Sequence, residues 1–441
     1  MAAKDRVRDH QTASLLRQEL GVIGQHAKVI VIGQLATMAY GVTDAVVAGR
    51  YSDEALATLA VASSIFISIY VSLMSVMQAL MPIYSELHGA GKPRELGSAF
   101  RQSLYLGLAL MLLGMGIMLQ SGFLLALFGV PESLRPGAVQ YLSILGWALI
   151  PTLGFRMFSA LNQSLGAPRI VMWLQMASLV VKVPLTIWFV FGGAGMPSMG
   201  VAGCAWASFV VNCLLFAAAF YTLRTRERYK PLTLFERWEQ PDWLRLKNYA
   251  ALGVPAGLAS MVEVTSYTLM GLLVARMGVI ATASHQIAAS MAAVLFMLPL
   301  SLSIASSARV SYWFGAGDAA LAHRLARAAV VLTVCVAFIA SSVMALLAIQ
   351  IANLYSKSPE VARLGAGLLL FVALYHVADA WQTIGCFLLR CWRIHGDAGH
   401  EAGGGEADVV GDAGLVAGFD QPIEIAGQGF IDRVNLGDEV A

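Results

Sequence analysis

Seven ionisable side chains lie inside strongly apolar stretches of this sequence, and their chemistry most needs an explanation. They are Asp44, Arg156, Lys182, Glu263, His285, His376 and Asp379. Placing such a group inside a membrane costs about 2.5–3.5 kcal/mol, so it is a functional candidate by default. Glu263 and Asp379 lie mid-stretch, and desolvation disfavours a bare carboxylate there. Two such acids predict a binding site for a proton or Na⁺.

The neighbours of these two acids at helical spacing are also polar. If both stretches are helices, Tyr267 shares a face with Glu263 at i+4. His376 and Gln382 flank Asp379 at i−3 and i+3. This pattern is suited to the wall of a cavity.

The remaining ionisable residues allow simpler interpretations. Asp44 is close to Arg50 at the outer end of its stretch, where an interfacial or capping role competes with a functional one. Arg156 and Lys182 lie within reach of headgroups by snorkelling, so we expect a structural role for both. The two histidines are expected more often to pack between helices than to act as ligands.

A membrane is the environment that these residues require. The chain has 441 residues, of which 58% are hydrophobic and 13% charged, which argues against a cytosolic enzyme. Ten apolar runs are each long enough to cross a bilayer as a helix. They lie near 22–48, 55–84, 99–121, 137–162, 169–192, 200–223, 249–277, 281–308, 325–351 and 361–390. The sequence therefore predicts an all-α polytopic membrane protein and no outer-membrane barrel.

Charge and cysteine content exclude several other classes of protein. The net charge is +2, which gives no sign of a nucleic-acid partner. That sum combines −9 for residues 395–441 with +11 for residues 1–394. The five cysteines are scattered without metal-ligand spacing, so neither a zinc site nor a disulfide framework is expected.

The distribution of lysine and arginine predicts the orientation and the domain division. The N-terminal leader and the even-numbered connections are the basic ones, which places the N-terminus in the cytoplasm. Seven basic residues lie in the one long charged connection. We expect a leader at 1–20, a six-helix lobe at 21–223, a cytoplasmic linker at 224–248, a four-helix lobe at 249–393 and an acidic, glycine-rich tail at 394–441.

An internal repeat supports two similar lobes. The shift of the chain that places Arg50 on Arg276 also places the Gly-Ala-Gly turn at 89–91 on the same turn at 315–317, without a gap. We call this displacement the repeat shift. Copies that each contain an even number of spans point the same way across the membrane. The result is a parallel repeat, whose default geometry is a rocking transporter with a central cavity.

The sequence contains neither the phosphate-binding loop of an ATP-driven pump nor the selectivity filter of a potassium channel. The string Gly89-Ala90-Gly91-Lys92-Pro93 lacks the upstream glycine and the hydroxyl residue of a phosphate-binding loop. The filter motif of potassium channels is missing too. Uphill transport would therefore draw on an ion gradient.

In this context the chain resembles the multidrug and toxic compound extrusion (MATE) family, most closely its NorM-like branch. The resemblance covers about Leu20 to Arg393. It is carried in order by Gln34-Leu35, Asp44-Ala45-Val46-Val47-Ala48-Gly49-Arg50, Lys182-Val183-Pro184-Leu185, Gly200-Val201-Ala202-Gly203-Cys204, Gly253-Val254-Pro255, Glu263, His285-Gln286-Ile287-Ala288, Met297-Leu298-Pro299, Asp379-Ala380-Trp381-Gln382 and Leu389-Arg390.

The resemblance implies export of cationic, often aromatic, compounds in exchange for Na⁺ or H⁺, without a cofactor. It implies that Glu263 and Asp379 form the cation site, which would hold Na⁺ in a Na⁺-coupled protein, and that Asp44 is a first-lobe acid. Candidates for the substrate cavity are Tyr267, His285, Gln286, His376 and Gln382. The implied setting is a monomer in the lipid bilayer of a bacterial inner membrane.

Two departures from the family pattern stand out. Val29 occupies a position where family members often carry proline, which puts a bend of the first helix in doubt. After Arg393 the family continues with two further apolar helices, whereas residues 395–441 contain no such run. We hypothesise that this tail is an out-of-frame or altered end; a disordered acidic tail is the alternative. Loss of two helices predicts weak transport.

Two other functions remain open from the sequence. A flippase for lipid-linked sugars of the same superfamily would rely on basic residues such as Arg156 and Lys182. An intramembrane enzyme could use His376 and Asp379 as acid and base. The sequence offers no nucleophile or metal set for such an enzyme.

Overall fold

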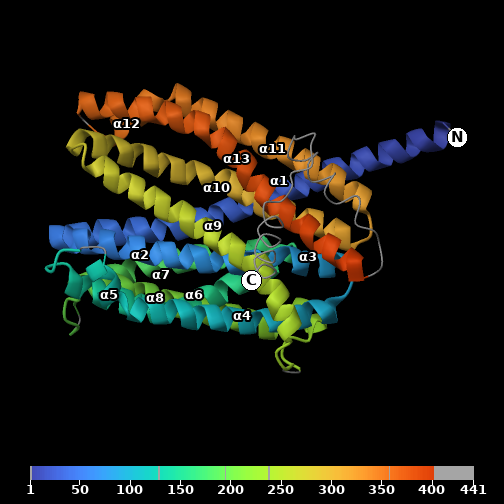
Figure 1. The fold of residues 1–441 in the computed structure, drawn as a ribbon, viewed down its shortest axis with the longest axis horizontal. Helices are drawn as coiled ribbons and strands as arrows, with labels where there is room; N and C mark the ends of the chain where they lie inside the picture. Colours follow the sequence, from blue (N-terminus) through green and yellow to red (C-terminus); the bar gives the residue numbers. More distant parts are fainter. Residues whose placement is uncertain (1, 128–129, 194, 237–238, 357, 402–441) are drawn as a thin grey trace, which may run out of the picture.

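The protein folds into a bundle of long helices in a computed structural model, which describes residues 2–127, 130–193, 195–236, 239–356 and 358–401 (Figure 1). The helices are α1 (Ala2–Tyr51), α2 (Asp53–Gln78), α3 (Met81–Gly89), α4 (Pro93–Leu119), α5 (Ser121–Leu127), α6 (Arg135–Ser164), α7 (Pro168–Phe191), α8 (Val201–Thr225), the 3-10 helix η1 (Glu227–Leu232), α9 (Trp243–Ala275), α10 (Val279–Gly315), α11 (Ala319–Leu346), α12 (Ala348–Tyr355) and α13 (Pro359–Glu401).

The predicted spans all lie on helices, with one difference in count. Within the described ranges, nine helical segments are long and apolar enough to cross a membrane, one fewer than the ten predicted. The segment that is not among the nine is 249–277, which lies on the 33-residue helix α9.

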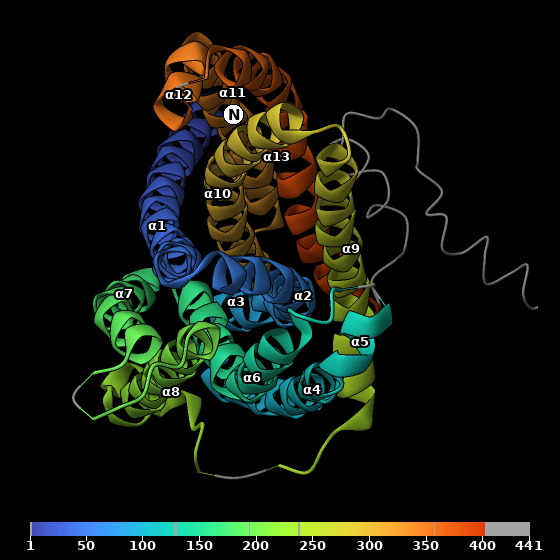
Figure 2. The ribbon, with the colours of Figure 1, turned by 90° about the vertical axis from the view of Figure 1, so that its left-hand side faces the viewer.

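The helix boundaries follow the repeat shift. The α2–α3 segment runs from Asp53 to Gly89 and α10 from Val279 to Gly315, each 37 residues long. Likewise α4 begins at Pro93 and α11 at Ala319. In Figure 2, α4 to α8 lie on one side and α10 to α13 on the other, with α1 and α2 between them. The two halves meet where α1 and α3 pack on α10, and where α2 packs on α9.

Two glycines related by the repeat lie at a very close approach between the halves. A Cβ atom at Gly89 would lie 1.9 Å from the carbonyl oxygen of Tyr312, and one at Gly315 would lie 1.9 Å from that of Glu86. Glu86 and Tyr312 are themselves related by the repeat shift. The contact is therefore nearly symmetric, and α3 and α10 cross here with backbone against backbone because neither glycine has a side chain.

We predict that Gly89→Ala destabilises the protein by about 1–3 kcal/mol, since the added methyl group must push two helices apart. The measurement is the thermal midpoint of unfolding in detergent. Gly116→Ala is the matched control, because a Cβ atom at Gly116 on α4 would have no heavy atom within 4 Å. Equal midpoints for the two variants would contradict the tight crossing.

An ion pair joins the halves near the same crossing. The guanidinium of Arg309 on α10 donates two hydrogen bonds of 2.7 Å to the carboxylate of Glu19 on α1. The Glu19 side chain is nearly buried, and the guanidinium carbon also lies 4.5 Å from the ring centre of Tyr312. Paired, bidentate geometry is what makes a shielded ion pair effective.

The predicted linker is anchored on α4, and this fixes the base of α9. The Glu239 carboxylate accepts hydrogen bonds from Ser98 and Arg101, and the Tyr105 hydroxyl donates to the Glu239 carbonyl at 2.7 Å. Partial burial alone would raise the pKa of Glu239, but the Ser98 and Arg101 hydrogen bonds, with the Arg101 charge, hold that pKa below its usual value. Asp242 then caps α9 by accepting from two backbone amides.

A depressed pKa makes the linker anchor sensitive to acid. The stabilisation by Glu239 is present above the ordinary glutamate pKa of about 4.5 and is lost as pH falls through the lower folded value. We expect wild-type protein to lose more thermal stability than Glu239→Gln when the pH is lowered through this range. Glu236→Gln, at an exposed glutamate of the same linker, should behave like wild type. Identical pH profiles for Glu239→Gln and wild type would contradict the anchor.

Candidate functional site

The two predicted mid-span acids come from different helices to one place. Glu263 lies on α9 and Asp379 on α13, and their carboxylates are close enough for the charges to interact. Asp379 is only 8% exposed, whereas Glu263 has an exposed side chain. One acid is therefore held within the helix packing while the other is accessible.

Tyrosine hydroxyls accompany these acids. Tyr375 donates a long hydrogen bond of 3.4 Å to Asp379, one helical turn away on α13. The Tyr375 hydroxyl is also within electrostatic range of the Tyr267 hydroxyl and of the Glu263 carboxylate. The sequence search missed Tyr375, although its i−4 spacing from Asp379 was a usable signal.

The other predicted cavity residues divide by exposure. Tyr267 is 45% exposed, and its ring centre lies 6.2 Å from that of the partly buried His285 on α10. Gln286 and Gln382 are exposed. His376 is 2% exposed, and its Nε2 atom has no hydrogen-bond partner among the described residues. An aromatic and imidazole pair thus lies near the acids, while His376 packs inside.

The chemistry open to this group is the binding of a monovalent cation. Within the described ranges no three His, Cys, Asp or Glu side chains are close enough to hold a metal ion together. A Na⁺ ion here would need hydroxyl or carbonyl oxygens beside the two carboxylates, since hard cations take several oxygen ligands. A proton needs only one of the acids.

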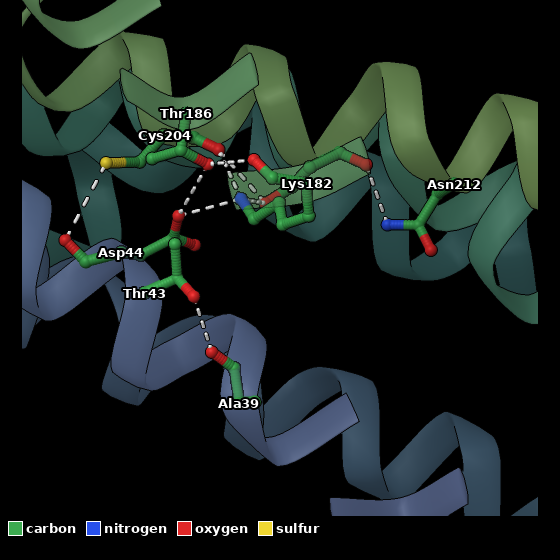
Figure 3. A network of polar contacts seen from close by, with 8 residues as sticks. Ala39, Thr43, Asp44, Lys182, Thr186, Cys204 and Asn212 are labelled. Atoms are coloured by element: carbon green, nitrogen blue, oxygen red, sulfur yellow. Dashed lines mark hydrogen bonds and ion pairs between the residues drawn. The ribbon is translucent and has the colours of Figure 1, made fainter. Parts of the chain in front are cut away.

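A second polar centre lies among α1, α7 and α8 (Figure 3). The Lys182 ammonium on α7 is 2.7 Å from the Asp44 carboxylate on α1, and the two form a salt bridge. Thr186 also donates to Asp44, at 3.5 Å. From α8, the Cys204 carbonyl accepts from Lys182 at 3.1 Å. Asp44 is 6% exposed and Lys182 is fully buried.

This centre corrects the expectation for Lys182 and removes the interfacial alternative for Asp44. Lys182 does not snorkel, because it lies in the interior of α7, well beyond Pro168 at its start, and its amine turns inward to a carboxylate. Asp44 is not an interfacial residue, because the packing of α7 and α8 on α1 covers it. A pairing between helices so far apart in the sequence carries no local signal.

Arg156 also turns inward rather than toward headgroups. Its Nε atom donates to the Tyr70 hydroxyl at 2.5 Å, and its Nη1 atom donates to the Gln34 amide oxygen at 3.4 Å. Arg156 and Gln34 border a cavity of about 20 Å³, which is room for one water molecule. The first half of the chain thus holds a partly buried cation among neutral polar groups.

Apolar helices that hold carboxylates and ion pairs within their spans, arranged as a parallel repeat, define a polytopic membrane transporter. The family model described as MatE matches residues 30–188 and 255–394, which is more than half of the chain. The chain belongs to this MATE family, which consists of transporters and not of enzymes.

Several relatives are similar over most of their length. The probable multidrug resistance protein NorM of Aromatoleum aromaticum is 33% identical over 85% of this chain and 81% of its own. The multidrug resistance protein MdtK of Yersinia pestis is 32% identical over 82% of this chain and 80% of its own.

Solved structures of the family share the fold. The eukaryotic MATE transporter AtDTX14 has a TM-score of 0.77 at 17% identity, covering 86% of this chain and 84% of its own. NorM-NG, solved with R6G and a monobody, has a TM-score of 0.68 at 23% identity, covering 94% and 95%. The protein is therefore a multi-pass membrane protein with the MATE fold.

Proposed function

We propose that this protein is a secondary antiporter that exports cationic, often aromatic, compounds in exchange for Na⁺ or H⁺. The observation that carries the proposal is the pair of acids on α9 and α13, one nearly buried and one accessible. The relatives of the chain support it, since they are named as multidrug resistance proteins. The aromatic Tyr267 beside His285 suits a flat organic cation.

The coupling follows from competition for negative charge. Glu263 and Asp379 release a proton or Na⁺ when a cationic substrate binds, and they recover an ion from the outside. A one-for-one exchange of a monovalent ion for a monovalent compound moves no net charge, so the concentration gradient of the ion, and not the membrane potential, drives export. A tenfold ion gradient supplies about 1.4 kcal/mol, which sustains about a tenfold concentration ratio of the exported compound.

Glu263→Gln and Asp379→Asn should each abolish ethidium efflux from intact cells, at unchanged protein levels, because the amides cannot exchange a cation. Glu360→Gln is the matched control, because it replaces an exposed carboxylate on α13, the helix of Asp379. Proteoliposomes with a Na⁺ gradient at fixed pH, or a pH gradient without Na⁺, would then identify the ion. Normal efflux in both acid variants would refute this coupling site.

The Glu19–Arg309 pair supports a cycle in which one end of the bundle is closed. Arg309 and Glu19 join α10 to α1 near the Gly89 crossing, beside connections predicted to be cytoplasmic. We propose that this pair breaks when the cavity opens to the cytoplasm. The interface is then one of the two alternating gates.

Replacing Glu19 by Gln should increase the open population about tenfold or more, since the partly buried Arg309 loses its counter-charge. Spin labels at Lys92→Cys and Ala320→Cys, both exposed, would report the separation of the two halves. The native cysteines are first replaced. The reversed pair, Glu19→Arg with Arg309→Glu, should restore the closed distance; an unchanged distance distribution in Glu19→Gln would rule out a gate.

The remaining features of the proposal concern setting and organisation. We propose a monomer in a bacterial inner membrane with a cytoplasmic N-terminus, and lobes at 21–223 and 249–393 joined by the linker at 224–248. Helix α1 already begins within the predicted leader, at Ala2. The altered tail at 394–441 remains a hypothesis, and its residues 402–441 lie outside the described part of the chain.

The flippase alternative has less support. It would use basic residues that are free to meet an anionic headgroup, but Lys182 is buried against Asp44. Arg156 remains a cation without an ion pair within the described ranges. Of the two classes, the antiporter accounts for the acids at Glu263 and Asp379 and the flippase does not.

A further inference from the structure

The Lys182 ammonium has three polar partners. It forms an ion pair with the Asp44 carboxylate at 2.7 Å and donates hydrogen bonds to the Ser208 hydroxyl at 2.7 Å and to the Cys204 carbonyl at 3.1 Å. A lysine amine carries three donors and no acceptor, so its partners here are all of the kind that it can bind. The side chain is fully buried.

Asp44 is enclosed by the same contacts. Its carboxylate meets the ammonium from α7 and the Thr186 hydroxyl, while the Cys204 thiol of α8 lies against its backbone carbonyl at 3.9 Å (Figure 3). The hydroxyl of the buried Tyr141 on α6 is within electrostatic range of the Asp44 carboxylate. Lys182 is the basic group paired with Asp44, and Asp44 is buried.

The acids of the second half differ in this respect. Within the described residues neither Glu263 nor Asp379 forms an ion pair with a lysine, arginine or histidine. Their charge is therefore available to a mobile cation. Asp44 is already neutralised by a cation that is covalently part of the chain.

We propose that Lys182 is a resident counter-ion that removes Asp44 from the ion-coupling cycle. Resting on the proposed antiport, this assigns the exchange of proton or Na⁺ to Glu263 and Asp379 alone. Protonation of Asp44 would leave the Lys182 ammonium buried without a charge partner, which is strongly unfavourable. Lys182 is thus a positioning residue, and Asp44 resembles a coupling acid only in sequence.

The test compares two single variants with the double variant in proteoliposomes under an imposed ion gradient. Asp44→Asn leaves the buried Lys182 ammonium without a charge partner, and Lys182→Met leaves the buried Asp44 carboxylate without one. For each single variant we expect the amount of folded protein or the transport rate to fall about tenfold or more. The double variant removes both charges with little change in volume. It should return to within about threefold of wild type, with the same ratio of ions to ethidium.

Glu263→Gln separates this proposal from the proposed function. If wild type shows no ion-driven transport, or Glu263→Gln transports normally, antiport through the second-half acids fails. If antiport holds but the folded double variant has lost ion-driven transport, or has changed its ion ratio, Asp44 is a coupling acid and the resident counter-ion is wrong.

A second measurement uses the unaltered protein and does not depend on folding of a variant. Dicyclohexylcarbodiimide modifies protonated carboxyl groups in apolar surroundings, and peptide mass spectrometry locates the adduct. We expect modification of Glu263 or Asp379, slowed by ethidium, with at least about tenfold less at Asp44 because its carboxylate is held by an ammonium. Modification of Asp44 at the rate of Glu263 would overturn the proposal.

Discussion

A charge inside the hydrocarbon layer must find a partner or a route to water, and this constraint sorts the ionisable residues of the chain. Asp44 and Lys182 satisfy it with each other, at 2.7 Å in a closed site. Glu19 and Arg309 do so across the two halves. Glu263 and Asp379 have no basic partner within the described residues, so in the proposed cycle their charge is available to a mobile ion.

The arrangement of the two halves depends on the absence of side chains as much as on their presence. Because Gly89 has no side chain, the Tyr312 carbonyl of α10 can approach α3 closely. Gly315 allows the Glu86 carbonyl of α3 to approach α10 in the same way, at the repeat-related position. The Glu19–Arg309 pair then supplies a specific, breakable contact at the same end.

The two halves share their helix boundaries but not their ionisable residues. The repeat shift carries α2–α3 onto α10, yet it places Glu263 on Thr37 and Asp379 on Leu153. The Asp44–Lys182 pair has no counterpart either, since Met270 stands opposite Asp44 in the repeat. The polar content of the two halves has therefore diverged, with a closed ion pair in one and an open acid pair in the other.

The sequence by itself determined the membrane class, the helix positions, the repeat and the mid-span acids, because apolar length and periodicity are local properties. Only the tertiary structure decided which acid is free and which is neutralised. The partner of Asp44 on α1 is Lys182 on α7, and the distance between two helices so far apart in the sequence is set by packing rather than by spacing along the chain.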